Sequence, residues 1–135
     1  MRFLLDTDTC IYALKQDRAV LGQLLAQSRA DVAISVITEA ELRTGAAKSS
    51  SPVKTGRLLE NFLEPLTVLE FSSDDALAYA QVRAKLERAG TPIGPMDMLI
   101  AAQAVCRRLI LVSNNEREFG RVPGLRLANW TKRAR

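Results

Sequence analysis

Short apolar runs alternate along this chain with longer stretches that have helical periodicity. Four short runs predict buried strands, which we place at residues 2–6, 32–36, 67–71 and 109–112. A further short strand is expected near residues 126–127. Apolar runs with little polar alternation are typical of parallel sheets, because helices cover both faces of such sheets.

The segments between these runs carry apolar residues at intervals of three or four, which predicts helices. We expect helices over residues 9–15, 18–28, 38–48 and 52–63, one between Ser72 and Gly90, and one that opens at Met96. In the second of these, four apolar residues share one side: Val20, Leu21, Leu24 and Leu25. Ser72 and Asp75 have the spacing of a capping box. Residues 113–124 are expected to form a polar loop.

Strands separated by helices predict an α/β fold, here a single domain with a central, mostly parallel sheet of four to five strands and helices on both faces. The 135 residues suffice for one core. We assign residues 1–135 to this domain, with residues 131–135 as a basic tail. A membrane-spanning stretch of roughly 20 apolar residues and a signal-peptide pattern are both missing from the sequence. We therefore expect a cytoplasmic protein with no membrane contact.

The two cysteines, Cys10 and Cys106, match no metal-binding or redox spacing. Each has apolar neighbours, which favours buried thiols, although a disulfide stays open as the alternative.

Four acidic residues fall where a ligand site is expected. Asp6 directly follows the first strand, with Asp8 two residues later; Glu41 lies in the helix after the second strand, and Asp97 opens the helix before the fourth. If the fourth strand pairs beside the first, the topological switch point brings these elements together. The positive end of its own helix also stabilises the Asp97 carboxylate.

Three carboxylates brought together without a counter-ion repel one another and lose hydration. The chain contains no histidine, and a set of oxygen ligands is the kind that Mg²⁺ or Mn²⁺ prefers. Such a cation activates water and polarises a phosphoryl oxygen, which predicts phosphodiester hydrolysis. The net charge of +4 adds an attraction for polyanions such as RNA.

With these segments in view, the chain resembles the PIN-domain ribonucleases, and closely the VapC-type toxins of bacterial toxin–antitoxin pairs. Four segments in order carry the resemblance: residues 3–9, 34–46, 90–102 and 113–125. The resemblance implies a metal-dependent endoribonuclease that cuts a structured RNA such as tRNA. It also implies a cognate VapB-type antitoxin that obstructs the acidic pocket, and a homodimer that assembles into a larger toxin–antitoxin complex.

Matched residue by residue, the resemblance places Asp6, Glu41 and Asp97 on the acidic metal ligands of the family. A fourth position, acidic in many relatives, falls on Asn115. Gln103 stands where many relatives carry histidine, and Asp8 where many carry asparagine.

The amide at Asn115 leaves three alternatives open, because a neutral amide is a poorer ligand than a carboxylate. The site works with three carboxylates, or Glu116 or Glu118 substitutes, or Asn115 only positions a water.

Several of these residues also have a purely structural interpretation. Asp6 has the position of a helix cap. Asp8 is either the N-cap of the helix at Thr9 or a group that supports the ligands. Glu39 and Glu41 are two residues apart on a helix and so face different sides. We assign Glu41 to the pocket and Glu39 to the solvent.

The remaining candidates are polar or basic side chains close to these positions. Thr7 and Ser113 bind phosphate or a ligand water, or else are turn residues. Arg43 faces the phosphate backbone of the substrate, or is simply a solvated arginine.

Two other functions compete with a nuclease. A phosphoacceptor domain also binds Mg²⁺ through paired aspartates, but the sequence lacks its further aspartate after a central strand and its lysine after a late one. A nonenzymatic RNA-binding or regulatory module fits the basic charge and leaves the carboxylates unexplained. Dinucleotide binding would need a glycine-rich loop after the first strand, and the chain has no histidine for a nucleophilic triad.

Overall fold

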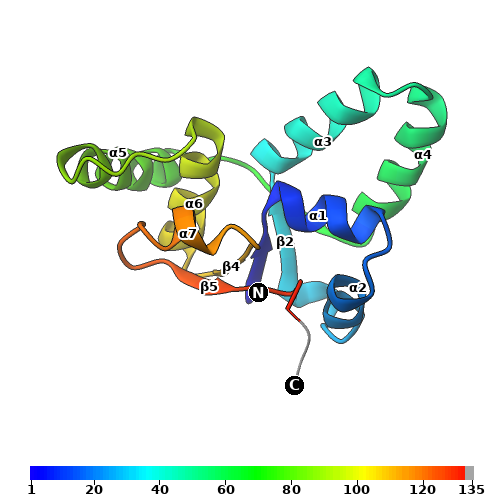
Figure 1. The fold of residues 1–135 in the computed structure, drawn as a ribbon, viewed down its shortest axis with the longest axis horizontal. Coiled ribbons are helices and arrows are strands. Elements are labelled where there is room, and N and C mark those ends of the chain that lie inside the picture. The colour runs from blue at the N-terminus through cyan, green and yellow to red at the C-terminus, as the bar shows by residue number, and fades with distance from the viewer. Residues whose placement is uncertain (133–135) are drawn as a thin grey trace.

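Five strands form the centre of the computed structural model, which describes residues 1–132 (Figure 1). The predicted basic tail falls largely on residues 133–135, which lie outside the described residues. The elements in chain order are β1 (Phe3–Leu5), α1 (Thr7–Leu14), α2 (Arg18–Leu25), the short 3₁₀ helix η1 (Arg29–Asp31), β2 (Val32–Ser35), α3 (Val36–Lys48), α4 (Pro52–Leu63), β3 (Thr67–Leu69), α5 (Ser73–Arg88), α6 (Pro95–Arg107), β4 (Ile110–Val112), α7 (Glu116–Phe119) and β5 (Arg126–Ala128).

The sheet has the strand order β3-β2-β1-β4-β5, and every neighbouring pair is parallel. β1 lies at the centre, with Leu4 opposite Ala33 of β2 on one side and Leu111 of β4 on the other. The predicted fold class and the pairing of the fourth strand with the first are therefore confirmed. From β1 the chain first adds β2 and β3 on one side and then returns to add β4 and β5 on the other side. The point between β1 and β4 is therefore a topological switch point, where ligands bind in open parallel sheets.

Helices cover both faces of this sheet (Figure 1). β1 and β2 are buried throughout their length, whereas the edge strands β3 and β5 each begin at an exposed residue. Leu4 and Leu111 face a core formed with α5, α6 and α7. Phe3 and Leu5 face the opposite core, formed with α1 to α4. Successive residues of a strand point to opposite faces, which is why one apolar run serves two cores.

Two helices begin earlier than the periodicity predicts, and the preceding strands are correspondingly shorter. The Asp6 carboxylate accepts a hydrogen bond from the Thr9 backbone N–H, so α1 begins at Thr7. Ser35 caps α3 through the Ile37 N–H, so that helix begins at Val36. Polar side chains at strand ends capture the first free N–H groups of a helix, and this starts the helix before its apolar pattern does.

Several local expectations were wrong. The polar loop at 113–124 contains the helix α7, whose four residues are too few to show a period. Leu25, which the periodicity places on the apolar side of its helix, is 81% exposed as the last residue of α2. The favoured expectation of free thiols is confirmed for both cysteines, with Cys10 buried and Cys106 only partly buried. Across residues 1–132, every helix is too short or too polar to cross a bilayer.

A buried charge network fastens α5 to α6. The Asp75 carboxylate accepts hydrogen bonds from the Arg107 guanidinium at 2.9 Å and from the Gln103 amide at 3.0 Å. The predicted capping box with Ser72 is also present. Burial of the Asp75 carboxyl raises its pKa, but these hydrogen bonds outweigh the burial and lower the pKa to about 2. Gln103 therefore holds the two helices together, away from the predicted metal ligands.

We predict that Asp75→Asn destabilises the fold by about 2 kcal/mol, because Arg107 and Gln103 lose the buried charged acceptor that they share. The pKa of Asp75 is lower in the folded state, so its contribution is complete above about pH 4 and disappears as the pH falls through about 2. Urea unfolding at neutral pH measures the effect. The matched control is Asp74→Asn, an exposed carboxylate in the same turn, for which we expect less than about 1 kcal/mol. Equal losses in both variants would contradict this account.

Candidate functional site

Asp6 lies at the centre of the carboxyl edge of the sheet. Its backbone N–H bonds to the Val112 carbonyl and so continues the pairing of β1 with β4. Its side chain is only 3% exposed and caps α1 through the Thr9 N–H at 2.8 Å. Burial raises the pKa of this carboxyl, while hydrogen bonds with Ser113 and Thr9 act in the opposite direction. The Asp6 side chain therefore has the capping role that the sequence allowed, and it lies at the edge of the sheet where the site is predicted.

Ser113 supports Asp6 from the end of β4. It is fully buried, and its hydroxyl lies close enough to the Asp6 carboxyl to lower the pKa of that group. The Ser113 hydroxyl also accepts a hydrogen bond from the Asn115 backbone N–H at 2.9 Å. Ser113 thereby fixes Asp6 and the following loop in one arrangement.

Thr7 connects the first helix to the third. Its hydroxyl donates to Glu41 Oε1 at 2.6 Å, which holds this carboxylate toward the carboxyl end of β1. Glu39 instead accepts a hydrogen bond from the Arg43 guanidinium. The predicted assignment of Glu41 to the pocket is consistent with this geometry, whereas Glu39 is partly buried beneath Arg43 and does not simply face the solvent.

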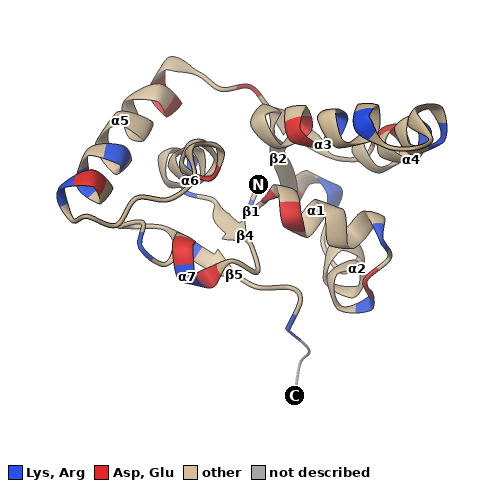
Figure 2. Cartoon of the chain, turned by 45° about the horizontal axis from the view of Figure 1, so that its top comes forward, with Lys and Arg blue, Asp and Glu red and all other residues tan. Residues whose placement is uncertain are grey.

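The pKa of Asp97 depends on the other acidic side chains nearby. It stands half-buried in the first turn of α6, and burial is the main reason that its pKa rises to about 6. The negative charges of four further residues raise the pKa in addition: Asp6, Glu41, Glu118 and Asp8. Acidic residues on α1, α3 and α7 thus contribute to the charge near Asp97 on α6, and Figure 2 marks the acidic positions on these helices in red.

The helix α7 provides a carboxylate that the sequence left undecided. Asn115 caps α7, and its side-chain amide donates to Glu118 Oε2 at 3.0 Å. Glu118 lies close enough to Asp97 to raise its pKa. Glu116 pairs instead with Lys132 at 2.9 Å. Of the open alternatives, the geometry favours Glu118 as the fourth acidic group, with Asn115 orienting it.

Two predicted residues have different environments from those expected. Asp8 lies inside the first turn of α1, since Asp6 occupies the N-cap, so the capping interpretation of Asp8 was wrong. Arg43 is exposed and pairs with Glu39 on α3 and Glu60 on α4. These two ion pairs orient Arg43 along the α3–α4 face, and its guanidinium is already occupied there.

The side chains at this edge offer only oxygen ligands, which fits a hard divalent cation. They do not form a closed cage: within residues 1–132, no three acidic, cysteine or histidine side chains are gathered tightly enough to hold a metal by themselves. Mutual repulsion separates carboxylates that lack a counter-ion. An open set of this kind suits Mg²⁺, which keeps several waters and binds proteins through one or two carboxylates.

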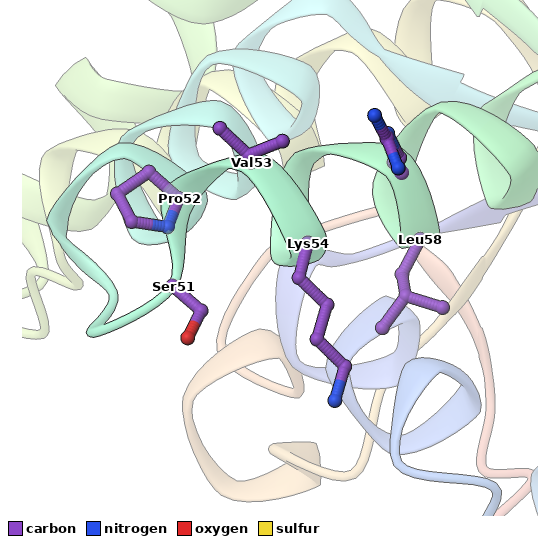
Figure 3. Close-up of a pocket in the computed structure, with 6 residues that line it drawn as sticks. Ser51, Pro52, Val53, Lys54 and Leu58 are labelled. Atoms are coloured by element: carbon purple, nitrogen blue, oxygen red, sulfur yellow. The ribbon is translucent and has the colours of Figure 1, made fainter.

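Concave surface alone does not identify this site. A hollow of about 550 Å³ lies at the start of α4, lined by Ser51, Pro52, Val53, Lys54, Arg57 and Leu58 (Figure 3). Its lining is apolar and basic and includes none of the carboxylates at the edge of the sheet. The chemistry is defined by charge and burial at that edge.

Comparison with known proteins gives consistent matches over almost the whole chain. The PIN domain family matches residues 3–125. A "tRNA(fMet)-specific endonuclease VapC" from Salmonella typhimurium is 40% identical over 130 residues, which cover 96% of this chain and 98% of the relative. A "Ribonuclease VapC2" from Haemophilus influenzae is 39% identical and covers the same shares of both chains.

Solved structures agree with this assignment. DNA-bound VapBC from Salmonella typhimurium contains a chain that superposes with a TM-score of 0.93 at 40% identity, covering 96% of this chain and 98% of the other. VapBC2 from Rickettsia felis, bound to a fragment of its promoter, gives a TM-score of 0.91 at 36% identity and covers 96% and 99% of the two chains.

We predict that Asp97→Asn stabilises the metal-free protein at neutral pH. The raised pKa means that the ionised carboxylate opposes folding, so stability falls as the pH rises from about 4 through about 6. The half-buried position limits the gain to about 1 kcal/mol, or about 2–4 °C in melting temperature. Thermal unfolding in EDTA across this pH range measures it.

Asp74→Asn is the control, since Asp74 is an exposed carboxylate in the first turn of a helix, as Asp97 is in its own. We expect no stabilisation from this change. A lower melting temperature for Asp97→Asn than for the wild type at neutral pH would show that the ionised Asp97 carboxylate does not destabilise the fold.

Proposed function

The chain belongs to the PIN-domain family and, within it, to the VapC ribonucleases, and we propose that it is a metal-dependent endoribonuclease controlled by a cognate antitoxin. The observation that carries this proposal is the placement of Asp6, Glu41, Asp97 and Glu118 at one edge of the sheet, where their charges add to burial in raising the pKa of Asp97. A group of repelling and mostly part-buried charges at a ligand-binding edge is typical of a functional site. A nonenzymatic RNA-binding module would not need these carboxylates, because their negative charge repels RNA.

The proposed substrate is a structured RNA, with tRNA as the favoured class. Two relatives, from Salmonella typhimurium and Shigella flexneri, are named tRNA(fMet)-specific endonucleases and are 40% and 39% identical to this chain. Structured RNA is selected largely by its shape and backbone. The net charge of +4 supports attraction to such a polyanion.

Asp6, Glu41 and Asp97 would hold the cation, Mg²⁺ or Mn²⁺, with Glu118 beside them. A cation bound there supplies Lewis-acid activation of water and neutralises charge on the phosphodiester. Thr7 positions Glu41, Ser113 positions Asp6, and Asn115 positions Glu118. Supporting hydrogen bonds of this kind orient ligands and tune their basicity.

A groove beside the site supports the antitoxin part of the proposal. It has a volume of about 360 Å³ between α1, α3 and α4, with Glu41 and Lys15 among mainly apolar neighbours such as Leu42 and Leu58. An apolar segment of a partner protein seated there would pass next to Glu41 and obstruct the carboxylates. The solved VapBC complexes support a VapB-type partner, and a homodimer within a larger toxin–antitoxin assembly is part of the same proposal.

We predict that Asp6→Asn and Asp97→Asn each reduce RNA cleavage by at least about 100-fold, since each removes a charged ligand. EDTA should abolish cleavage by the wild type, and Mn²⁺ or Mg²⁺ should restore it. The measurement is cleavage of purified total tRNA by the antitoxin-free protein, followed by mapping of the new RNA ends.

Glu118 and Glu116 provide an internal comparison within α7. We expect Glu118→Gln to slow cleavage about tenfold, and Glu116→Gln, which removes only the pair with Lys132, to leave it within about twofold. Metal-independent cleavage, or an Asp97→Asn variant that cuts at the wild-type rate, would rule out the proposed mechanism.

A further inference from the structure

A second, smaller pocket adjoins the carboxylates between α1 and the loop that follows β4. Its volume is about 300 Å³, and its lining consists of Asp8, Ile11, Tyr12, Lys15 and Asn114. This is the lower end of the size of small-molecule sites, which suits a single nucleotide unit. The catalytic assignment above uses none of Tyr12, Lys15 and Asn114.

The pocket follows one side of α1. Asp8 and Tyr12 are four residues apart, and Lys15 lies three residues further on, so all three share a helix face. The seven residue steps from Asp8 to Lys15 extend about 10 Å along the helix axis. One end of the stripe lies beside the carboxylates, because Asp8 is in the first turn of α1, which Asp6 caps. A strand held at the carboxylates would therefore reach Lys15 with a neighbouring nucleotide.

The positive charge of Lys15 is the feature of this stripe that bears on RNA binding. An RNA phosphate that approaches five carboxylates is repelled unless nearby cations compensate. Two cations on the surrounding elements are already paired, Arg43 with Glu39 and Glu60, and Lys132 with Glu116. Lys15 is the cation in the lining of this pocket, and it also lines the groove that contains Glu41. A lysine at the C-terminus of a helix is also favoured by the helix dipole, so the position of Lys15 alone has a structural explanation. The helix dipole does not explain why Lys15 and Asp8 line the same pocket.

A hydrogen bond fixes the aromatic wall of the pocket. The exposed Asn114 side chain donates from Nδ2 to the Tyr12 hydroxyl at 3.1 Å. The Tyr12 ring packs partly against the core, so its position is well defined. Its hydroxyl proton is still available to a ligand, and the ring offers a surface on which a base can stack. Asn114 directly follows Ser113, which contacts Asp6, so the loop links this wall to the metal ligands.

From these contacts we propose that the pocket binds the nucleotide next to the scissile phosphate, with Lys15 holding its phosphate and Tyr12 and Asn114 contacting its base and sugar. The three side chains are positioning residues and take no part in the chemical step. This inference rests on the proposed function and adds a subsite for single-stranded RNA to it. Contacts to the phosphate position a strand without reading its sequence, so Lys15 should act on all substrates alike.

The test measures binding of a short, labelled, single-stranded RNA of mixed sequence by fluorescence anisotropy. The full chain is used with millimolar Mg²⁺ in an Asp97→Asn background, so that the RNA stays intact. We expect Lys15→Ala to weaken binding about fivefold and to reduce the slope of log K against log salt by about one. Asn114→Ala should weaken binding about threefold, since it releases the Tyr12 hydroxyl and removes a polar contact.

Lys85→Ala is the matched control, because it removes the same charge from an exposed position on α5. It should change binding by less than about twofold. In the otherwise wild-type enzyme, Lys15→Ala should raise KM about fivefold and leave kcat within about twofold. Melting temperatures confirm that each variant is folded.

Equal weakening by Lys15→Ala and Lys85→Ala would overturn the subsite in favour of general electrostatic attraction. Normal RNA binding by Lys15→Ala combined with weaker antitoxin binding would also overturn it, and would assign the surface to the protein partner. A wild type that cuts RNA only with metal, together with a Lys15→Ala variant of unchanged KM, would refute the subsite alone. A wild type that never cuts RNA would refute the proposed function.

Discussion

Repulsion between acidic side chains at one edge of a parallel sheet is the constraint on which the rest of this structure depends. Folding delivers Asp6, Glu41, Asp97 and Glu118 to the same edge from four different elements. The cost is visible in Asp97, whose pKa rises to about 6 through burial and the neighbouring charges. A fold selected for stability alone would separate these groups or pair them with cations. Their retention is explained if a divalent cation and a phosphodiester complete the site.

The remainder of the fold holds this arrangement in place. The Asp6 N–H and the Thr9 hydroxyl both bond to the Val112 carbonyl, which ties the start of α1 to the end of β4. Hydrogen bonds from Gln103 and Arg107 to the buried Asp75 carboxylate hold α6 against α5. The helix that carries Asp97 is therefore anchored by a charge pair whose partners satisfy each other. The protein thus contains one carboxylate, Asp75, that is paired with a cation, and one group of carboxylates around Asp97 that repel one another. Only the second arrangement is typical of a functional site.

The sequence was most informative where a residue's role depends on its immediate neighbours. Asp6 could be predicted because an apolar run ends at it, and Ser72 with Asp75 because a capping box is a local pattern. The parallel sheet followed from alternation of strands and helices, while the identification of Glu41 and Asp97 needed the family resemblance as well. Contacts between distant positions could not be predicted: Thr7 and Glu41 are 34 residues apart, and Gln103 and Asp75 are 28 apart. The choice between Glu116 and Glu118 depended on α7, a helix too short to have a sequence period.

The most direct test of this account is a carbon-detected NMR titration of the side-chain carboxyls, performed without metal and again with saturating Mg²⁺. Without metal, Asp97 should titrate near pH 6, well above the ordinary aspartate value of about 3.9. With Mg²⁺, its pKa should fall below that ordinary value, because the cation replaces repulsion with attraction. A carboxyl of Asp97 that titrates near its ordinary value in both conditions would contradict the claim that the acidic groups converge and that a cation relieves their repulsion.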